Sequence, residues 1–305
     1  MTDATLDQAR QSIAKGSKSF AMASTFLPRG MYEDCVMLYA WCRHADDVID
    51  GQEAGFASQA AGDPAARLVE LRDLTHRALQ GDAAAPVYAG LARVMAARDI
   101  PHRHVDELLD GFAMDVNGQV YHSTRDLLEY CYRVAGVVGV MMARIMGVRD
   151  EAVLDRASDL GLAFQLTNIA RDVIDDARIG RVYLPRDLLR AEGIEAVDPD
   201  DLSQRPALHR VALRLLDEAE TYYRSADVGI AALPRRPALA IAAARNIYRQ
   251  IGVRLRAQGP DAWKGRLSTT KAEKLRLAAA AVGSTVLAPR RRAAPVSRDG
   301  LYIRP

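Results

Sequence analysis

Two aspartate-rich stretches organise this sequence: "RHADDVID" at residues 43–50 and "RDVIDDARIGRVYLP" at residues 171–185. Each stretch places three aspartates within five residues, at relative positions 0, 1 and 4 in the first and 0, 3 and 4 in the second. The two patterns are mirror images of each other. We therefore expect two helices that run antiparallel across one shared site, as two halves of one cage rather than as a duplicated motif.

On a helix, each stretch gathers its polar side chains into one stripe. The first stripe consists of Tyr39, Arg43, Asp46 and Asp50. The second consists of Gln165, Asn168, Asp172 and Asp176. A single polar stripe is typical of a solvent-facing helix. However, like charges four residues apart destabilise a helix by about 0.2–0.5 kcal/mol per pair, and the other faces of both helices are apolar, which favours inner helices.

Inner carboxylates at this density are stable when a cation neutralises them. Ligands that are all oxygen atoms favour Mg²⁺ or Mn²⁺ over zinc. Mg²⁺ usually bridges one or two carboxylates to substrate phosphates, so two facing stripes predict several metal ions with a diphosphate between them. The spacing does not match a calcium-binding EF-hand loop.

Groups that can bind phosphate oxygens stand near both stretches. Arg43 and Arg171 lie within a turn of the aspartates, and the second stretch continues with Arg178, Arg181 and Tyr183. Near the N-terminus, "GSKSF" at residues 16–20 offers two serines and a lysine. Taken alone, that segment is explained better by a helix that stops at the glycine and is followed by a turn.

The composition is that of a globular protein: of 305 residues, 49% are hydrophobic and 26% charged. A net charge of +2 gives no reason to expect nucleic acid as a partner. Three cysteines without paired spacing argue against a disulfide framework and a zinc cluster. The acidic start and the absence of a long apolar run predict neither a signal peptide nor a membrane span, so we expect a cytoplasmic protein.

Helical periodicity dominates, and the predicted fold class is all-α. Helices are expected at residues 6–15, 31–50, 65–79, 84–97, 104–117, 124–146, 151–176, 207–231, 237–257 and 269–287. Residues 51–66 are expected to form a mobile loop. Residues 1–289 are expected to form a single domain, followed at 290–305 by a basic, proline-containing C-terminal tail that is poorly ordered.

Four motifs appear in the order and at the spacing of a known family: "SKSF", "YAWCRHADDVID", "EYCYRVAGVVG" at residues 129–139, and "QLTNIARDVIDDARIGRVYLP". Together they resemble the squalene/phytoene synthase family, and most of all its bacterial phytoene-forming members. The resemblance implies an isoprenoid-synthase helical bundle around a central cavity.

The activity that this resemblance implies is a head-to-head condensation of two geranylgeranyl diphosphates to phytoene through a cyclopropylcarbinyl diphosphate. The alternative is a C30 dehydrosqualene or squalene synthase that acts on farnesyl diphosphate, with the same motifs. A chain-elongating prenyltransferase or terpene cyclase should lack the first and third motifs. A catalytically silent helical assembly factor is disfavoured by the intact aspartates.

The resemblance also implies roles for individual residues. The metal ligands are Asp46, Asp50, Asn168, Asp172 and Asp176, and these aspartates are expected to be catalytic together with Tyr130 and Arg171. The expected substrate-binding residues are Ser17, Lys18, Ser19, Phe20, Tyr39, Arg43, Gln165, Asn168, Arg181, Tyr183 and Tyr248. Ordinary packing explains Tyr248 nearly as well. Asp47 and Asp175 point off the stripes, which predicts salt bridges rather than direct ligation.

The implied cofactors are several Mg²⁺ or Mn²⁺ ions that bridge diphosphate, and no NADPH is expected. The implied partners are prenyl diphosphates. Because substrate and product are lipids, we also expect peripheral contact with the inner face of the membrane and hand-over of product to downstream carotenoid enzymes.

Overall fold

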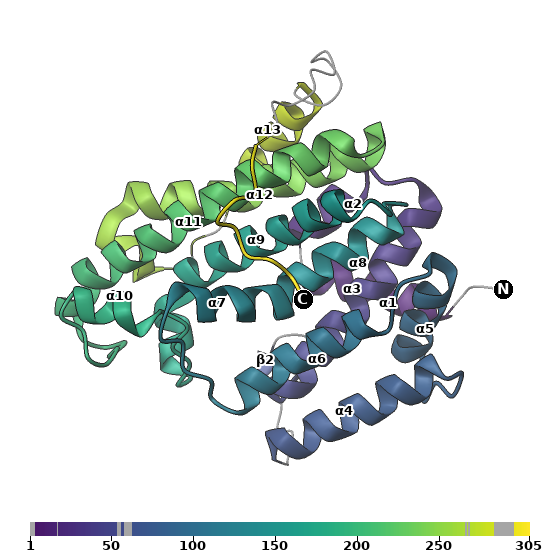
Figure 1. Cartoon of the computed structure of the whole chain (residues 1–305), viewed down its shortest axis with the longest axis horizontal. Helices are drawn as coiled ribbons and strands as arrows, with labels where there is room; N and C mark the ends of the chain where they lie inside the picture. Colours follow the sequence, from purple (N-terminus) through teal and green to yellow (C-terminus); the bar gives the residue numbers. More distant parts are fainter. Residues whose placement is uncertain are drawn as a thin grey trace.

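The computed structural model describes residues 4–16, 18–53, 56–57, 63–265, 267, 269–283 and 296–305. These residues form a bundle of α-helices (Figure 1), as the sequence predicts. The α-helices are α1 (Ala4–Gly16), α2 (Lys18–Ser24), α3 (Arg29–Asp50), α4 (Pro64–Leu79), α5 (Pro86–Arg98), α6 (Arg103–Val116), α7 (Thr124–Cys131), α8 (Val137–Ile145), α9 (Glu151–Arg178), α10 (Arg186–Ala191), α11 (Arg205–Ala232), α12 (Arg235–Gln258) and α13 (Lys271–Val282). The shorter elements are a π-helical turn, η1 (Tyr132–Gly136), and two 3₁₀ turns, η2 (Leu202–Gln204) and η3 (Gly259–Lys264).

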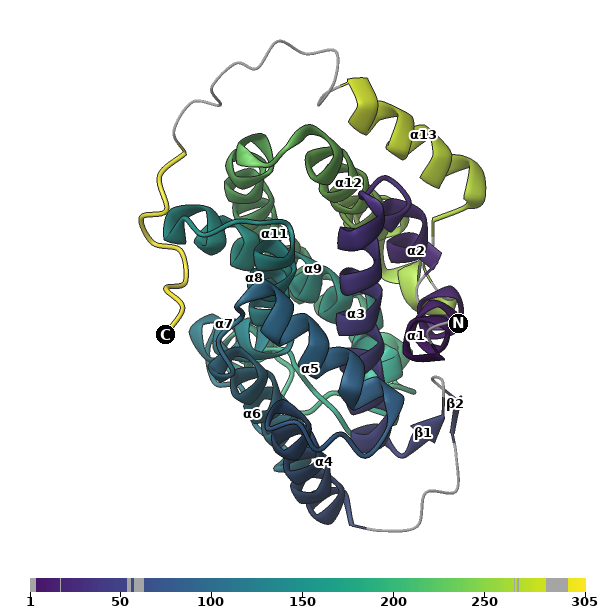
Figure 2. The ribbon, with the colours of Figure 1, turned by 90° about the vertical axis from the view of Figure 1, so that its right-hand side faces the viewer.

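Helix α9 lies in the interior, with α8, α11 and α12 around it (Figures 1 and 2). Apolar side chains on its middle turns, including Leu162, Leu166 and Ile169, are almost fully buried. Their burial is the main reason that this helix keeps a fixed position, because apolar surface removed from water contributes about 25 cal/mol per Å². The second aspartate stretch is therefore carried by a helix that is held on several sides.

The segment 124–146, predicted as one helix, is interrupted by η1 between α7 and α8. At this point the chain approaches α9 very closely. A Cβ atom on Gly161 would lie 2.3 Å from the carbonyl oxygen of Ala135 and 2.7 Å from the Cα atom of Gly136. Only glycine permits this backbone contact, which holds η1 against α9.

Other boundaries also differ from the prediction. Helices α2 and α10 were not expected, and α2 begins where a turn was predicted after Gly16. In the segment predicted as a mobile loop, two strands of two residues each, β1 (Gln52–Glu53) and β2 (Phe56–Ala57), pair antiparallel. These elements are too short to give a clear periodic signal in the sequence.

The prediction of a poorly ordered C-terminal tail is wrong for residues 296–305, which pack along α9 (yellow in Figure 1). Arg298 donates two hydrogen bonds, both of 2.9 Å, to Asp159 of α9, and Arg304 donates one of 2.6 Å to Asp155 one turn earlier. The backbone N–H of Tyr302 donates to the hydroxyl of Tyr222 on α11. Arg298 and Arg304 attach this segment because α9 presents carboxylates to them.

Candidate active site

Both aspartate stretches occupy the last turns of their helices. Helix α3 ends at Asp50, where Gly51 caps it in the left-handed conformation with φ 63°, and α9 ends two residues after Asp176. The C-terminal end of a helix carries a partial negative charge from its aligned peptide dipoles, so carboxylates there are unfavourable unless cations neutralise them. The helix dipoles and the aspartates therefore both make the site negative, and nearby cations stabilise it.

In the first stretch, arginines neutralise the carboxylates. Arg43 donates from Nη1 to Asp46 at 3.1 Å and from Nη2 to Asp47 at 2.6 Å. Arg181, far along the chain, donates from Nη2 to Asp50 at 2.6 Å. Burial and the charge of the neighbouring Asp50 raise the pKa of Asp46 to about 6. The ion pair of Asp47 confirms the predicted salt-bridge role of that residue.

In the second stretch, Arg171 donates from Nε to Asp172 at 2.7 Å and also donates to it from Nη2. Asp175 is exposed and pairs with Arg178 at 3.4 Å, again as predicted. Burial and the charge of Asp172 raise the pKa of Asp176 to about 7, although Arg181 and Arg171 oppose this shift. The arginines therefore offset only part of the effect that burial and the neighbouring carboxylate have on the pKa of Asp176.

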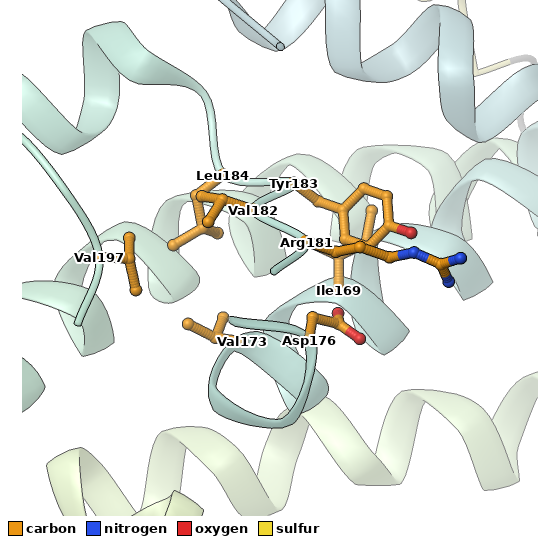
Figure 3. Close-up of a pocket in the computed structure, with 8 residues that line it drawn as sticks. All are labelled: Ile169, Val173, Asp176, Arg181, Val182, Tyr183, Leu184 and Val197. Atoms are coloured by element: carbon orange, nitrogen blue, oxygen red, sulfur yellow. The ribbon is translucent and has the colours of Figure 1, made fainter. Parts of the chain in front are cut away.

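Arg181 connects the two stretches. It pairs with Asp50 of α3, and it lines a small pocket, partly open to solvent, together with Asp176 of α9 (Figure 3). The remaining lining residues are Ile169, Val173, Val182, Tyr183, Leu184 and Val197. The C-terminal ends of α3 and α9 therefore meet at one arginine. Both stretches stand in the last turns of their helices, and the antiparallel run of the two helices across the site stays a prediction.

The donor set of this site fits a hard divalent cation. Asn168 lies one turn before Asp172, and its Oδ1 atom is buried without a hydrogen-bond partner. A buried, unpaired amide oxygen beside a row of carboxylates is suited to metal ligation. Within the described ranges, no three carboxylate, imidazole or thiolate side chains converge on one point.

A cluster of tyrosines adjoins the aspartates. The rings of Tyr130 and Tyr183 stack with their centroids 5.0 Å apart and an interplanar angle of 21°, and Tyr121 packs against both. Burial raises the pKa of Tyr130 far above its usual value and that of Tyr183 in the same direction, so both hydroxyls remain protonated. The structure thus brings Tyr130 and Tyr183, both predicted as site residues, into contact.

Asp115, in the last turn of α6, is a residue of this site to which the sequence assigned no role. It accepts hydrogen bonds of 2.9 Å from the hydroxyls of both Tyr130 and Tyr183. In the sequence it differs little from Asp110 five residues earlier, which pairs with arginines at the surface. No local pattern could distinguish the two, because the tyrosines that bind Asp115 come from other segments.

The other predicted site residues are placed less completely. Tyr248 stacks on Phe164 with ring centroids 4.3 Å apart, and it interacts electrostatically with Tyr39 and Arg171. Burial raises the pKa of Tyr39 to about 12. Gln165 is half-buried on α9, three residues before Asn168. Ser17 lies outside the described residues, and of Lys18, Ser19 and Phe20 only the backbone is described, at the start of α2.

Comparison with known families shows to which family this chain belongs. The sequence profile described as squalene/phytoene synthase matches residues 13–273. The chain belongs to the squalene/phytoene synthase family. The matched range includes both aspartate stretches, Asp115 and the stacked tyrosines, so the whole candidate site lies within it.

Among members of this family, the chain is similar to the 15-cis-phytoene synthase of Paracoccus sp. (strain N81106 / MBIC 01143), with 55% identity over 296 residues that cover 97% of this chain and 96% of the relative. It is 50% identical to the 15-cis-phytoene synthase of Pantoea ananas, with 98% of each chain covered. It is also 33% identical to the presqualene diphosphate synthase of Rhodopseudomonas palustris (strain ATCC BAA-98 / CGA009), over 88% of this chain and 93% of the relative.

Solved structures of squalene/phytoene synthase type share the fold. A dehydrosqualene synthase in complex with ligand superposes with a TM-score of 0.81 at 26% identity, covering 92% of this chain and 96% of the other. The squalene synthase HpnC from Alicyclobacillus acidocaldarius gives a TM-score of 0.74 at 24% identity, covering 84% and 94% of the two chains. These likenesses confirm the predicted all-helical fold class.

Proposed function

We propose that this chain condenses two molecules of geranylgeranyl diphosphate head to head to form phytoene, the first committed step of carotenoid biosynthesis. The observation that carries the proposal is the meeting of two aspartate stretches at Arg181, in a chain that is 55% identical over nearly its whole length to a protein named 15-cis-phytoene synthase. Opposed carboxylates joined by an arginine suit a substrate that carries a diphosphate.

The arginines of the site bind and orient the diphosphate. Arg43, Arg171 and Arg181 each present guanidinium N–H groups beside the aspartates, and such groups form strong charge-assisted hydrogen bonds with phosphate oxygens. In the substrate-free arrangement these N–H groups are bonded to carboxylates. When a diphosphate binds, the same N–H groups can donate to its oxygens with little movement of the side chains. The carboxylates would then bind the cations.

The residues proposed to hold Mg²⁺ or Mn²⁺ are Asp46, Asp50, Asn168, Asp172 and Asp176. When bound, these ions neutralise the negative charge that develops on the departing diphosphate. The protein's own contribution is to fix ligands from two helices around one leaving group, so that the stabilising charges need no rearrangement as the bond breaks.

Once diphosphate departs, the allylic cation is attacked by the double bond of the second substrate, and a proton is lost as the cyclopropane ring closes. The second ionisation and rearrangement lose another proton and give the conjugated triene. Tyr130 and Tyr183 stand beside the diphosphate-binding residues, where the carbon that carried the diphosphate must lie. Aromatic ring faces attract cations and exclude water, which would quench them.

The alternative substrate is farnesyl diphosphate, which would give a C30 product. The similarity to a solved dehydrosqualene synthase and to a presqualene diphosphate synthase supports this alternative. The residues that bind the diphosphate would be the same for both substrates. The higher identity to proteins named phytoene synthase favours the C20 substrate.

Turnover of labelled substrates tests the proposal. We expect purified protein with Mg²⁺ and labelled geranylgeranyl diphosphate to release a C40 hydrocarbon with the chromophore of a conjugated triene, without NADPH. Farnesyl diphosphate should be converted at least about tenfold more slowly, since lost apolar contact weakens binding by about 0.8 kcal/mol for each CH₂ group. Chromatography of the extracted hydrocarbon measures both. If neither substrate yields a hydrocarbon, the proposed function is wrong.

We further propose that the protein works at the membrane surface, where its lipid substrates and product reside. In the described part of the chain, no helix is long and apolar enough to cross a membrane. Peripheral contact should therefore be reversible and electrostatic, and we expect co-sedimentation with anionic liposomes at low salt that is lost at high salt. Equal sedimentation with and without liposomes would contradict this.

A further inference from the structure

Asp115 connects two tyrosines that come from different parts of the chain. Its Oδ2 atom accepts from the hydroxyl of Tyr130 at the end of α7, and its Oδ1 atom accepts from that of Tyr183 in the segment between α9 and α10, both at 2.9 Å. One carboxylate therefore fixes both hydroxyl ends of a pair whose rings are stacked. Holding two side chains from separate elements in one stack costs conformational entropy, and hydrogen bonds to a shared acceptor offset that cost.

The surroundings of Asp115 are unfavourable for a carboxylate. Burial raises its pKa and the charge of Asp50 adds to this, against the opposing effects of Arg181 and the two tyrosine hydroxyls. Asp115 also contributes to the raised pKa of Asp46. A carboxylate whose pKa is raised by folding destabilises the fold at neutral pH. A neutral group of the same shape would suit stability better, so a gain for stability does not account for the aspartate.

The stacked rings of Tyr130 and Tyr183 lie where they can act on the substrate. Tyr183 is two residues from Arg181, which pairs with Asp50, so the stacked rings adjoin the diphosphate-binding end of the site. A phenol whose hydroxyl donates a hydrogen bond to a carboxylate carries more electron density in its ring than a phenol hydrogen-bonded to water. Such a ring attracts a cation more strongly.

From this geometry, and resting on the function proposed above, we propose that Asp115 is a positioning residue: through the hydroxyls of Tyr130 and Tyr183 it holds the stacked rings as one electron-rich wall beside the allylic cation. Among the described residues, its side-chain hydrogen bonds come from the two tyrosines and from none of the proposed metal ligands. Its effect should therefore fall on the chemical step rather than on substrate binding.

The test is Asp115→Asn, assayed with geranylgeranyl diphosphate and Mg²⁺. We expect kcat to fall by about 10²-fold, since a displaced catalytic group can cost that much, while KM changes by less than about threefold. We expect the Tm to stay the same or to rise, because the buried charge is removed. A residue with a merely structural role would show the reverse, a lower Tm with kcat retained in the folded fraction.

The matched control is Asp110→Asn, which removes a carboxylate from the same helix. Asp110 is half exposed and pairs with Arg72 and Arg133 at the surface, so kcat should stay within about twofold. Tyr183→Phe provides a second check. If Asp115 acts through this hydroxyl, the double variant Asp115→Asn with Tyr183→Phe should lose much less than the product of the two single losses.

A crystal structure of Asp115→Asn separates this proposal from the proposed function. We expect the two rings to leave their stacked arrangement, and this can be seen whether or not the chain forms a hydrocarbon. Stacked rings together with an undiminished kcat would overturn the role of Asp115 while leaving the function intact. If the unaltered protein forms no hydrocarbon from either substrate, the proposed function fails, and with it the cation that the stacked wall is proposed to face.

Discussion

Asp50→Asn and Asp172→Asn should each lower the rate of hydrocarbon formation by about 10²–10³-fold, the usual cost of removing one group that stabilises charge in the transition state. Each substitution removes one negative charge from a different helix of the same site. The amide keeps the shape of the side chain but binds a divalent cation far more weakly than a carboxylate does. Initial rates at saturating Mg²⁺ and substrate measure the effect.

The fold should survive both substitutions. Asp172 raises the pKa of Asp176, so its replacement removes a repulsion from α9. Circular dichroism and the Tm should therefore stay close to those of the unaltered protein. Asp175→Asn is the matched control, because this carboxylate lies in the same stretch but is exposed and pairs with Arg178. Full activity in both Asp50→Asn and Asp172→Asn would remove the metal assignment.

Arg298→Ala should lower the free energy of unfolding by about 3–5 kcal/mol, because it leaves a buried charge without its partner. Asp159 is 1% exposed, and Arg298 is its only cationic hydrogen-bond partner among the residues that the structure describes. After the substitution, the carboxylate keeps only the hydroxyl of Ser225. Urea unfolding followed by circular dichroism measures the loss.

Two further variants test this interpretation. Arg256→Ala removes an arginine from an exposed pair with Asp217 and should cost less than about 1 kcal/mol. Adding Asp159→Asn to Arg298→Ala removes the unpaired charge and should recover much of the lost stability. If Arg298→Ala behaves like Arg256→Ala, the C-terminal segment does not stabilise α9 as the contacts indicate.

The aspartate stretches could be predicted as site residues because their signal is local. Three carboxylates within five residues of a helix, with apolar residues on the other faces, need a cation wherever the helix lies. The separation of Asp47 and Asp175 from the stripes is equally local, and their ion pairs with Arg43 and Arg178 confirm it. Arg181 was predicted to bind phosphate from its place after the second stretch, but its pairing with Asp50 could not be foreseen.

Asp115 and Arg298 show where local reasoning ends. Neither had a predicted role in the site, and each is bonded to a residue distant in the sequence, Tyr183 in one case and Asp159 in the other. A periodic pattern says which face of a helix is polar, but it says nothing about which other segment will meet that face.

The sequence by itself determined that this chain is helical and that its two aspartate stretches suit one metal-diphosphate site, since periodicity and charge density act over a few residues. Prenyl diphosphate chemistry was implied by the resemblance of four motifs to a known family. Only the tertiary structure decided that Arg181 lies between the ends of α3 and α9, that Asp115 accepts hydrogen bonds from both Tyr130 and Tyr183, and that the final ten residues are attached to α9. Those contacts join residues far apart in the chain, and they form only when burial of the common core brings their helices together.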